Sequence, residues 1–312
     1  MTERRRGYGK ARVPLTCGEF VQGNLAGYDF LVSCPVSLCS QAEVWLGDPG
    51  PETLLLPPLP PGGGAKALRA LQLALKELEG RGRRAWLKIS RPVPPGKGFG
   101  TSTADIVAAV FGAAQALGRD IAPREVARIA LSIEPTDGTM FHGLTLFDHR
   151  RGRIARFLGL PPPMQVLIYD LGGEVDTRRF NWRADLAALN ARKEPRVREA
   201  LWKVSHGIGR GDPWLLGEGA TCSALAHQSI LPKEGLEEIV AAARGVGAYG
   251  VVVAHSGTLV GVLLPGDEAV KSRVEESLSS FGHAIPAGLA RVVGGWKVSD
   301  EPGGRRDGDG SG

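Results

Sequence analysis

Cysteines are few in this sequence, and long apolar runs are missing altogether. The four cysteines form no C-x-x-C pair and no Cys/His ligand cluster, which argues against a zinc module and against a disulfide framework. No apolar run reaches the roughly 18 to 20 residues that span a bilayer, and the basic N-terminus is not followed by an apolar segment. We therefore expect a cytoplasmic protein with reduced thiols and no membrane association.

Aromatic residues and concentrated positive charge are also scarce. Aromatic side chains make up 6% of the chain, and the formal net charge is only +5. Basic residues gather at 4–6 and 81–84 but form no longer block. Nucleic-acid binding needs a basic stripe or stacking platforms, so we expect no nucleic-acid partner. A mildly basic chain suits a site for an anionic small molecule.

Glycine and proline are abundant, with 44 and 22 residues in a chain of 312. Part of this surplus lies in the segment 47–64 and in the apolar-free stretch 301–312, which we expect to be a surface loop and a flexible tail. The length predicts two domains or one large one. Three consecutive prolines at 161–163 mark the boundary, which gives domains at 1–160 and 161–300.

Hydrophobic periodicity predicts an α+β order of elements. In the first domain it predicts strands at 30–32, 43–46, 85–90 and 144–147, and helices at 68–78, 101–117 and 123–132. In the second domain it predicts a strand at 164–169, several helices between 182 and 243, paired strands at 251–254 and 258–264, a helix at 267–281 and a last strand at 290–298. This β-α-β-β-α-β order is typical of a split-βαβ, ferredoxin-like domain.

The most informative local pattern is a strand, a glycine-rich turn and a helix around PPGKGFGTSTAD at 94–105. Glycines at alternate positions let backbone N–H groups approach phosphate oxygens, and the helix that follows directs its positive dipole end at the same point. Lys97 adds a positive charge. Thr101 and Ser102 each offer a hydroxyl that can cap the helix or bind a magnesium ion.

Two familiar phosphate-binding loops do not fit this segment. A Walker loop needs Ser or Thr directly after the lysine, but Gly98 follows Lys97. The dinucleotide fingerprint needs a third glycine where Thr101 stands. On spacing alone, a third interpretation stays open, in which the turn merely joins a strand to a capped helix.

Residues 94–104 resemble the motif P-x-x-x-G-L-G-S-S-A-A of the GHMP kinases, with Phe99 in place of Leu. Segments 14–23, 134–148 and 170–177 resemble the branch of this family that includes the L-threonine kinase of cobalamin biosynthesis. The resemblance extends over residues 11 to about 264. It implies a ribosomal protein S5-like N-terminal domain, a ferredoxin-like C-terminal domain, and ATP-dependent phosphorylation of the hydroxyl of L-threonine. The product would be O-phospho-L-threonine, a precursor of the cobalamin side chain.

The resemblance also implies roles for individual residues. ATP would be bound by Pro95, Gly96, Lys97, Gly98, Phe99, Gly100, Thr101, Ser102 and Thr103. Ser102 and Glu134 would bind Mg²⁺, and Asp137 and Lys97 would be catalytic, with Asp137 facing the acceptor hydroxyl. The substrate would be bound by Glu19, Asp137, Gly172, Gly173 and Glu174, with Glu19 pairing with an amino group.

Several alternatives remain open at this point. Asp105 rivals Asp137 as the proton acceptor, and the reaction can also proceed without one. Homoserine and serine are alternative acceptors, and a nucleotide-binding regulator without chemistry is an alternative function. A homodimer is possible. His142 and His149 lack ligand spacing, so we expect them to be surface or core residues.

Overall fold

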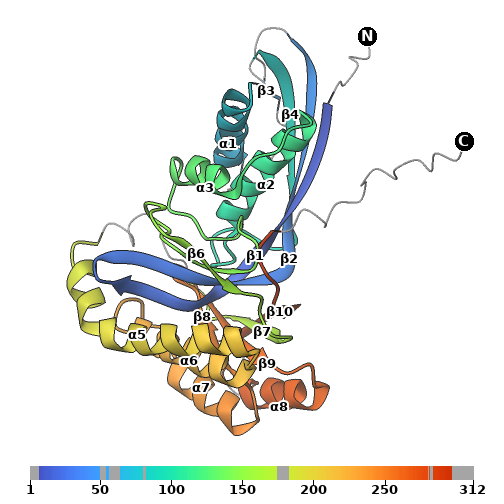
Figure 1. Ribbon diagram of the computed structural model, residues 1–312. Coiled ribbons are helices and arrows are strands. Elements are labelled where there is room, and N and C mark those ends of the chain that lie inside the picture. The colour runs from blue at the N-terminus through green and yellow to red at the C-terminus, as the bar shows by residue number, and fades with distance from the viewer. Residues whose placement is uncertain are drawn as a thin grey trace, which may run out of the picture.

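A long antiparallel hairpin of β1 (Gly7–Leu25) and β2 (Tyr28–Pro49) runs through the whole molecule (Figure 1). The computed structural model describes residues 7–49, 54–55, 64–79, 82–173, 183–279, 281 and 284–296. The sequence predicted only short strands here, and the prediction was wrong for a physical reason. Residues 13–23 are buried without alternation, and register shifts after Pro14 and around Glu19 interrupt the two-residue period.

The first half of the chain builds a sheet covered by helices. In it, β2 pairs with β4 (Arg83–Ser90), and β3 (Leu54–Leu55) pairs with β4. Helices α1 (Gly64–Glu77), α2 (Thr101–Ala116) and α3 (Pro123–Leu131) gather at this end of the molecule (Figure 1). The α2 backbone lies directly on β1, because a Cβ on Gly9 would stand 2.0 Å from the carbonyl oxygen of Gly112. The three predicted helices are confirmed here.

Two short strands connect this part to the second half. The predicted strand β5 (Leu144–Phe147) is confirmed, and it pairs with β2 and with β6 (Ala155–Gly159). Strand β6 was not predicted from the sequence, because its residues are half-buried or exposed and so carry little hydrophobic alternation.

The second half contains four antiparallel strands in the order β10-β7-β9-β8, as the split-βαβ pattern predicts. These strands are β7 (Gln165–Asp170), β8 (Gly250–Val253), β9 (Leu259–Leu264) and β10 (Ile285–Arg291). Helices α5 (Leu186–Arg210), α6 (Pro213–His227), α7 (Leu236–Gly245) and α8 (Glu268–Leu278) lie at this end (Figure 1). The last strand lies earlier than the predicted 290–298.

The two halves share one sheet, because Glu19 in β1 pairs with Val253 in β8. The domain boundary at 160/161 stays a prediction. The stretch 301–312 and most of the loop at 47–64 lie outside the described residues, although β2 continues to Pro49. Of the helices in the described part of the chain, none is both long enough and apolar enough to cross a bilayer.

The crossing of β1 and β8 depends on Gly18, and this gives a first prediction. Gly18 has φ +65°, and a Cβ there would stand 2.4 Å from the backbone carbonyl group of Val253. Gly18→Ala should therefore lower the free energy of unfolding by about 2–4 kcal/mol, from the left-handed backbone plus the overlap. Gly27→Ala is the matched control, because Gly27 has φ +84° but no atom within 4 Å of the added Cβ. Gly27→Ala should lower the free energy of unfolding in urea by only about 1 kcal/mol. Equal losses of stability in the two variants would contradict the close contact between Gly18 and Val253.

Candidate active site

The glycine-rich loop between β4 and α2 has the backbone that the sequence predicted. Gly96, Gly98 and Gly100 have φ values of +85°, +107° and +62°, in the region that favours glycine. Helix α2 begins at Thr101, and Gly100 occupies the N-cap without a side-chain hydrogen bond. The prediction that Thr101 or Ser102 caps the helix is therefore wrong. The first-turn N–H groups of α2 point at the loop, where an anion can accept from them.

Backbone contacts fix this loop against two distant segments. The Thr16 N–H donates to the Phe99 carbonyl at 2.9 Å, and the Thr258 N–H donates to the Lys97 carbonyl at 2.9 Å. A Cβ on Gly257 would stand 2.5 Å from the Cα of Gly98. The loop is thus held by β1 on one side and by the β8–β9 turn on the other, which fixes its shape before any ligand binds.

Ser102 and Glu134 lie together, as the sequence analysis expected of a metal pair. The Ser102 hydroxyl donates to the Glu134 carboxylate, and the Lys66 ammonium pairs with the same carboxylate and lies 3.3 Å from Ser102 Oγ. These hard oxygen ligands suit Mg²⁺, and Lys66 shows that the same oxygens accept a cation. The described residues contain no cluster of three acidic, His or Cys ligands. Mg²⁺ that also binds phosphate oxygens needs only one or two carboxylates.

Asp137 and Glu19 line one cavity beside the loop, together with Thr16, Gly100 and His149. Burial, and then the charge of Asp137, raises the pKa of Glu19, and its Oε2 has no hydrogen-bond partner among the described residues. Burial, and then the charge of Glu134, raises the pKa of Asp137 to about 6. The Asp137 N–H donates to Thr103 Oγ1 at 3.2 Å, which fixes the turn. The cavity therefore presents two acids that can receive a cation or a proton.

Asp105, the alternative proton acceptor, makes its contacts outside this cavity. It is 1% exposed, accepts a hydrogen bond from Ser40 Oγ at 2.6 Å and forms an ion pair with Arg91. It does not line the cavity that holds Asp137. The geometry therefore favours Asp137 over Asp105 as the acid that meets a ligand.

Lys97 and the segment after β7 meet at another edge of the loop. Lys97 Nζ lies 3.0 Å from a carboxylate oxygen of Asp170 and donates to the Gly173 carbonyl at 3.3 Å. The Gly172 N–H donates to Asp170 at 3.0 Å. Gly172 and Gly173 thus adjoin the loop, whereas Glu174 lies outside the described residues.

Two residues of the site were missed from the sequence. Lys66 lies in the first turn of the amphipathic α1, where a lysine is usually solvated. His149 was expected to be a surface or core residue; it is buried, and it also lines the cavity of Asp137. Neither position carries a spacing signal that would have identified it.

Comparison with known proteins agrees with this fold and loop. The family model described as GHMP kinases N terminal domain matches residues 65–145. An L-threonine kinase of Citrobacter freundii is 34% identical over 254 residues, which cover 81% of this chain and 85% of that protein. One from Salmonella typhimurium is 32% identical over 255 residues, covering 81% and 82%.

Solved structures of lower sequence identity share the fold of this chain. Homoserine kinase from Cytophaga hutchinsonii superposes with a TM-score of 0.71 at 16% identity, over 95% of this chain and 98% of that one. L. major mevalonate kinase, in complex with R-mevalonate, superposes with a TM-score of 0.67 at 18% identity, over 94% and 98%. These likenesses confirm the predicted two-domain α+β fold.

An ATP-dependent kinase that acts on a hydroxyl group of a small molecule is the class that fold, loop and relatives define together. The chain belongs to the GHMP kinases.

The raised pKa of Asp137 predicts that this acid destabilises the fold at neutral pH. Because its pKa is higher in the folded than in the unfolded chain, its ionisation removes stability as the pH rises from about 4 to about 6. Asp137→Asn should therefore raise the melting temperature at pH 7 by roughly 2–4 °C while lowering turnover. The exposed Asp120→Asn is the control and should change neither. A lower melting temperature for Asp137→Asn would contradict the prediction.

Proposed function

We propose that this kinase phosphorylates the hydroxyl of L-threonine and forms O-phospho-L-threonine. One observation carries the proposal: the buried Glu19 carboxylate, with an unpartnered oxygen, shares a cavity with Asp137 beside the glycine-rich loop. A buried carboxylate oxygen without a partner is well satisfied by a cation, and the ammonium group of an amino acid is a cation of the right size. The two L-threonine kinase relatives support the same substrate.

The loop would hold the triphosphate of ATP. The backbone N–H groups of residues 96–103 would donate to phosphate oxygens at the start of α2, and the Lys97 ammonium would add positive charge. Ser102 and Glu134 would bind Mg²⁺, with Lys66 displaced from the carboxylate. When bound, the metal neutralises the negative charge that the phosphate oxygens carry during transfer.

Asp137 would accept the proton of the threonine hydroxyl. The hydroxyl oxygen then forms a bond to the γ-phosphorus of ATP, while the bond from that phosphorus to the bridging oxygen breaks and ADP leaves. A pKa near 6 leaves Asp137 ionised at pH 7 and still able to take a proton. Glu19 would hold the ammonium group and thereby position the hydroxyl next to Asp137.

Serine and homoserine are the alternative acceptors. Serine differs from threonine by one methyl group, which is worth only about 1–3 kcal/mol of discrimination in an apolar pocket. The homoserine kinase among the similar structures shares the fold with this chain at 16% identity. A cytoplasmic location, a homodimer and a use of the product in cobalamin synthesis stay predictions.

An ADP-release assay with Mg-ATP tests the substrate. L-Threonine should give the highest kcat/KM, serine and homoserine lower values, and mevalonate no turnover. Glu19→Gln should raise KM for L-threonine about 10-fold or more, because an ion pair with the ammonium group is lost. The exposed Glu125→Gln is the matched control and should behave as the wild type. No ADP release with any hydroxy amino acid would refute the proposal.

The proton acceptor gives a pH profile. Because Asp137 must be ionised and its pKa is about 6, kcat/KM for L-threonine should fall below pH 6, about tenfold per pH unit. Binding of ATP, measured separately over pH 5–8, should change much less. A flat profile down to pH 5 would exclude Asp137 as the base.

A further inference from the structure

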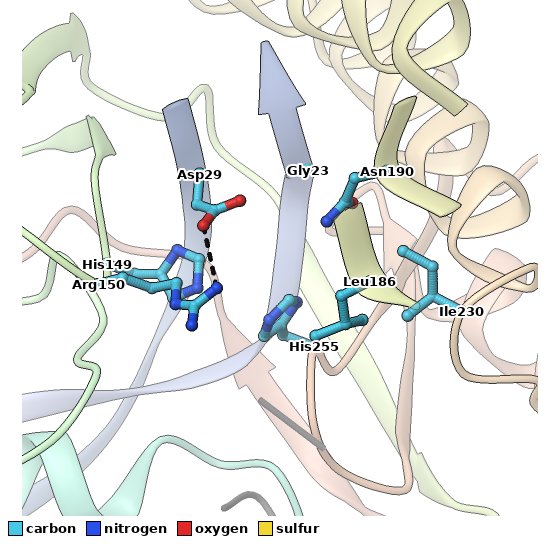
Figure 2. A pocket seen from close by; sticks show the side chains of 8 residues that line it. All are labelled: Gly23, Asp29, His149, Arg150, Leu186, Asn190, Ile230 and His255. Atoms are coloured by element: carbon cyan, nitrogen blue, oxygen red, sulfur yellow. Dashed lines mark hydrogen bonds and ion pairs between the residues drawn. The ribbon is translucent and has the colours of Figure 1, made fainter. Parts of the chain in front are cut away.

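A second cavity adjoins the one that holds Asp137, and His149 and His255 line both. Figure 2 shows Asp29, His149 and Arg150 approaching from one side and Asn190 from the other, with His255 between them. Asp29 belongs to β2 and Asn190 to α5, while the two histidines lie in the connections after β5 and β8. The wall between the cavities is therefore built from segments that are far apart in the sequence.

His149 is a buried polar residue that its surroundings do not satisfy. It is 5% exposed, and its Nδ1 has no hydrogen-bond partner in the described part of the chain. The Thr136 N–H donates to the His149 carbonyl at 2.9 Å, so the backbone of His149 is tied to the turn that carries Asp137. Burial lowers the pKa of His149 to about 4, which keeps the ring neutral at pH 7. A neutral imidazole can hold its proton on Nδ1 and donate it to an acceptor.

Charged side chains of both signs lie around this wall. Arg150 pairs with Asp29 at 3.2 Å, at the second cavity. Lys193 is 5% exposed, and its ammonium donates to the Gln22 carbonyl and lies 3.3 Å from His227 Nδ1. The equally buried Lys233 donates to the Gly257 carbonyl at 2.7 Å. Burial lowers the pKa of both lysines to about 8, so they remain mostly charged at pH 7.

The acceptor site thus has two chemically different sides. Glu19 and Asp137 are acids, whereas the wall at His149 offers a hydrogen-bond donor, beside an Arg150 whose charge Asp29 balances. A zwitterion meets both requirements, because it carries an ammonium and a carboxylate on one carbon atom. An alcohol without a carboxylate leaves the donor at His149 without a partner, which costs binding energy.

We propose that His149 binds the carboxylate of the amino-acid acceptor through Nδ1–H, with Arg150 adding positive charge from the adjoining cavity. This inference rests on the proposed function and adds the second half of substrate recognition to it. Glu19 holds the ammonium, His149 the carboxylate and Asp137 the hydroxyl. Three contacts on three groups also select the hand of the α-carbon, so D-threonine should be a poor substrate.

This contact can be tested by a double-mutant cycle in which one change is made in the protein and the other in the substrate. Wild type and His149→Leu are compared on L-threonine and on L-threonine amide, which lacks only the carboxylate charge. His149→Leu should lower kcat/KM for L-threonine about 10- to 100-fold but for the amide only about twofold. The reason is that the neutral amide accepts a weaker hydrogen bond from His149 Nδ1–H than the carboxylate does. His149→Asn keeps an N–H donor and should recover most of the loss. His142→Leu is the matched control, since His142 is exposed and stacks on Phe157.

Equal losses on both substrates, or an Asn variant as poor as the Leu variant, would overturn the inference. Melting temperature and ATP binding report whether His149→Leu folds. If it does not, Arg150→Gln decides: KM for L-threonine should rise about tenfold and KM for the amide little, while the exposed Arg151→Gln matches wild type. An Arg150→Gln variant with an unchanged KM for L-threonine then overturns the inference. If the wild type turns over no hydroxy amino acid, the proposed function is refuted as well. If it does, and His149→Leu lowers kcat/KM equally on L-threonine and its amide, only the carboxylate contact is refuted.

Discussion

The site depends on one steric constraint: three segments from distant parts of the chain touch through backbone, where a side chain would not fit. Gly98 lies against Gly257, and a Cβ on Gly100 would stand 2.6 Å from Thr16 Oγ1 and from an Asp137 oxygen. This closeness allows the loop to accept backbone hydrogen bonds from β1 and from the β8–β9 turn. It also brings Glu19 and Asp137 next to the loop, so that the same close packing fixes the shape of the loop and the position of the two acids.

The side chains around each carboxylate of the site decide its chemistry. Asp105 forms an ion pair with Arg91, accepts a hydrogen bond from Ser40 and so ties α2 to the neighbouring strands. Glu134 faces Ser102 and the Lys66 ammonium, so it is suited to hold a cation. Asp137 and Glu19 have no lysine or arginine against them in the described ion pairs, and burial raises the pKa of each. Four acids of the same chemical type thus acquire different functions from their surroundings.

The features that the sequence predicted well are local ones. The period of α2, the glycines before it and the order of strands in the second half depend on neighbours in the chain, and the structure has them. The lengths of β1 and β2 were not predictable, because burial on both faces and bulges remove the alternation. Lys66 and His149 were missed because a role defined by contact with Glu134 or with a cavity leaves no pattern in the sequence. Asp105 was ambiguous because an acid near the start of a helix gives the same sequence pattern whether it meets a ligand or an arginine.

The two like charges of Glu19 and Asp137 have a consequence for selectivity. Each raises the free energy of ionising the other, and burial adds to this cost. An ammonium ion that enters their cavity favours the charged state of both, and by thermodynamic reciprocity it lowers the pKa of Asp137. With the amino-acid substrate proposed above, the ammonium group would thus favour the ionised form of Asp137 that a base requires. An alcohol without an amino group offers the two buried acids no such cation, so it should bind more weakly, whereas Asp137, with a pKa of about 6, stays mostly ionised at pH 7 and the chemical step itself is little affected.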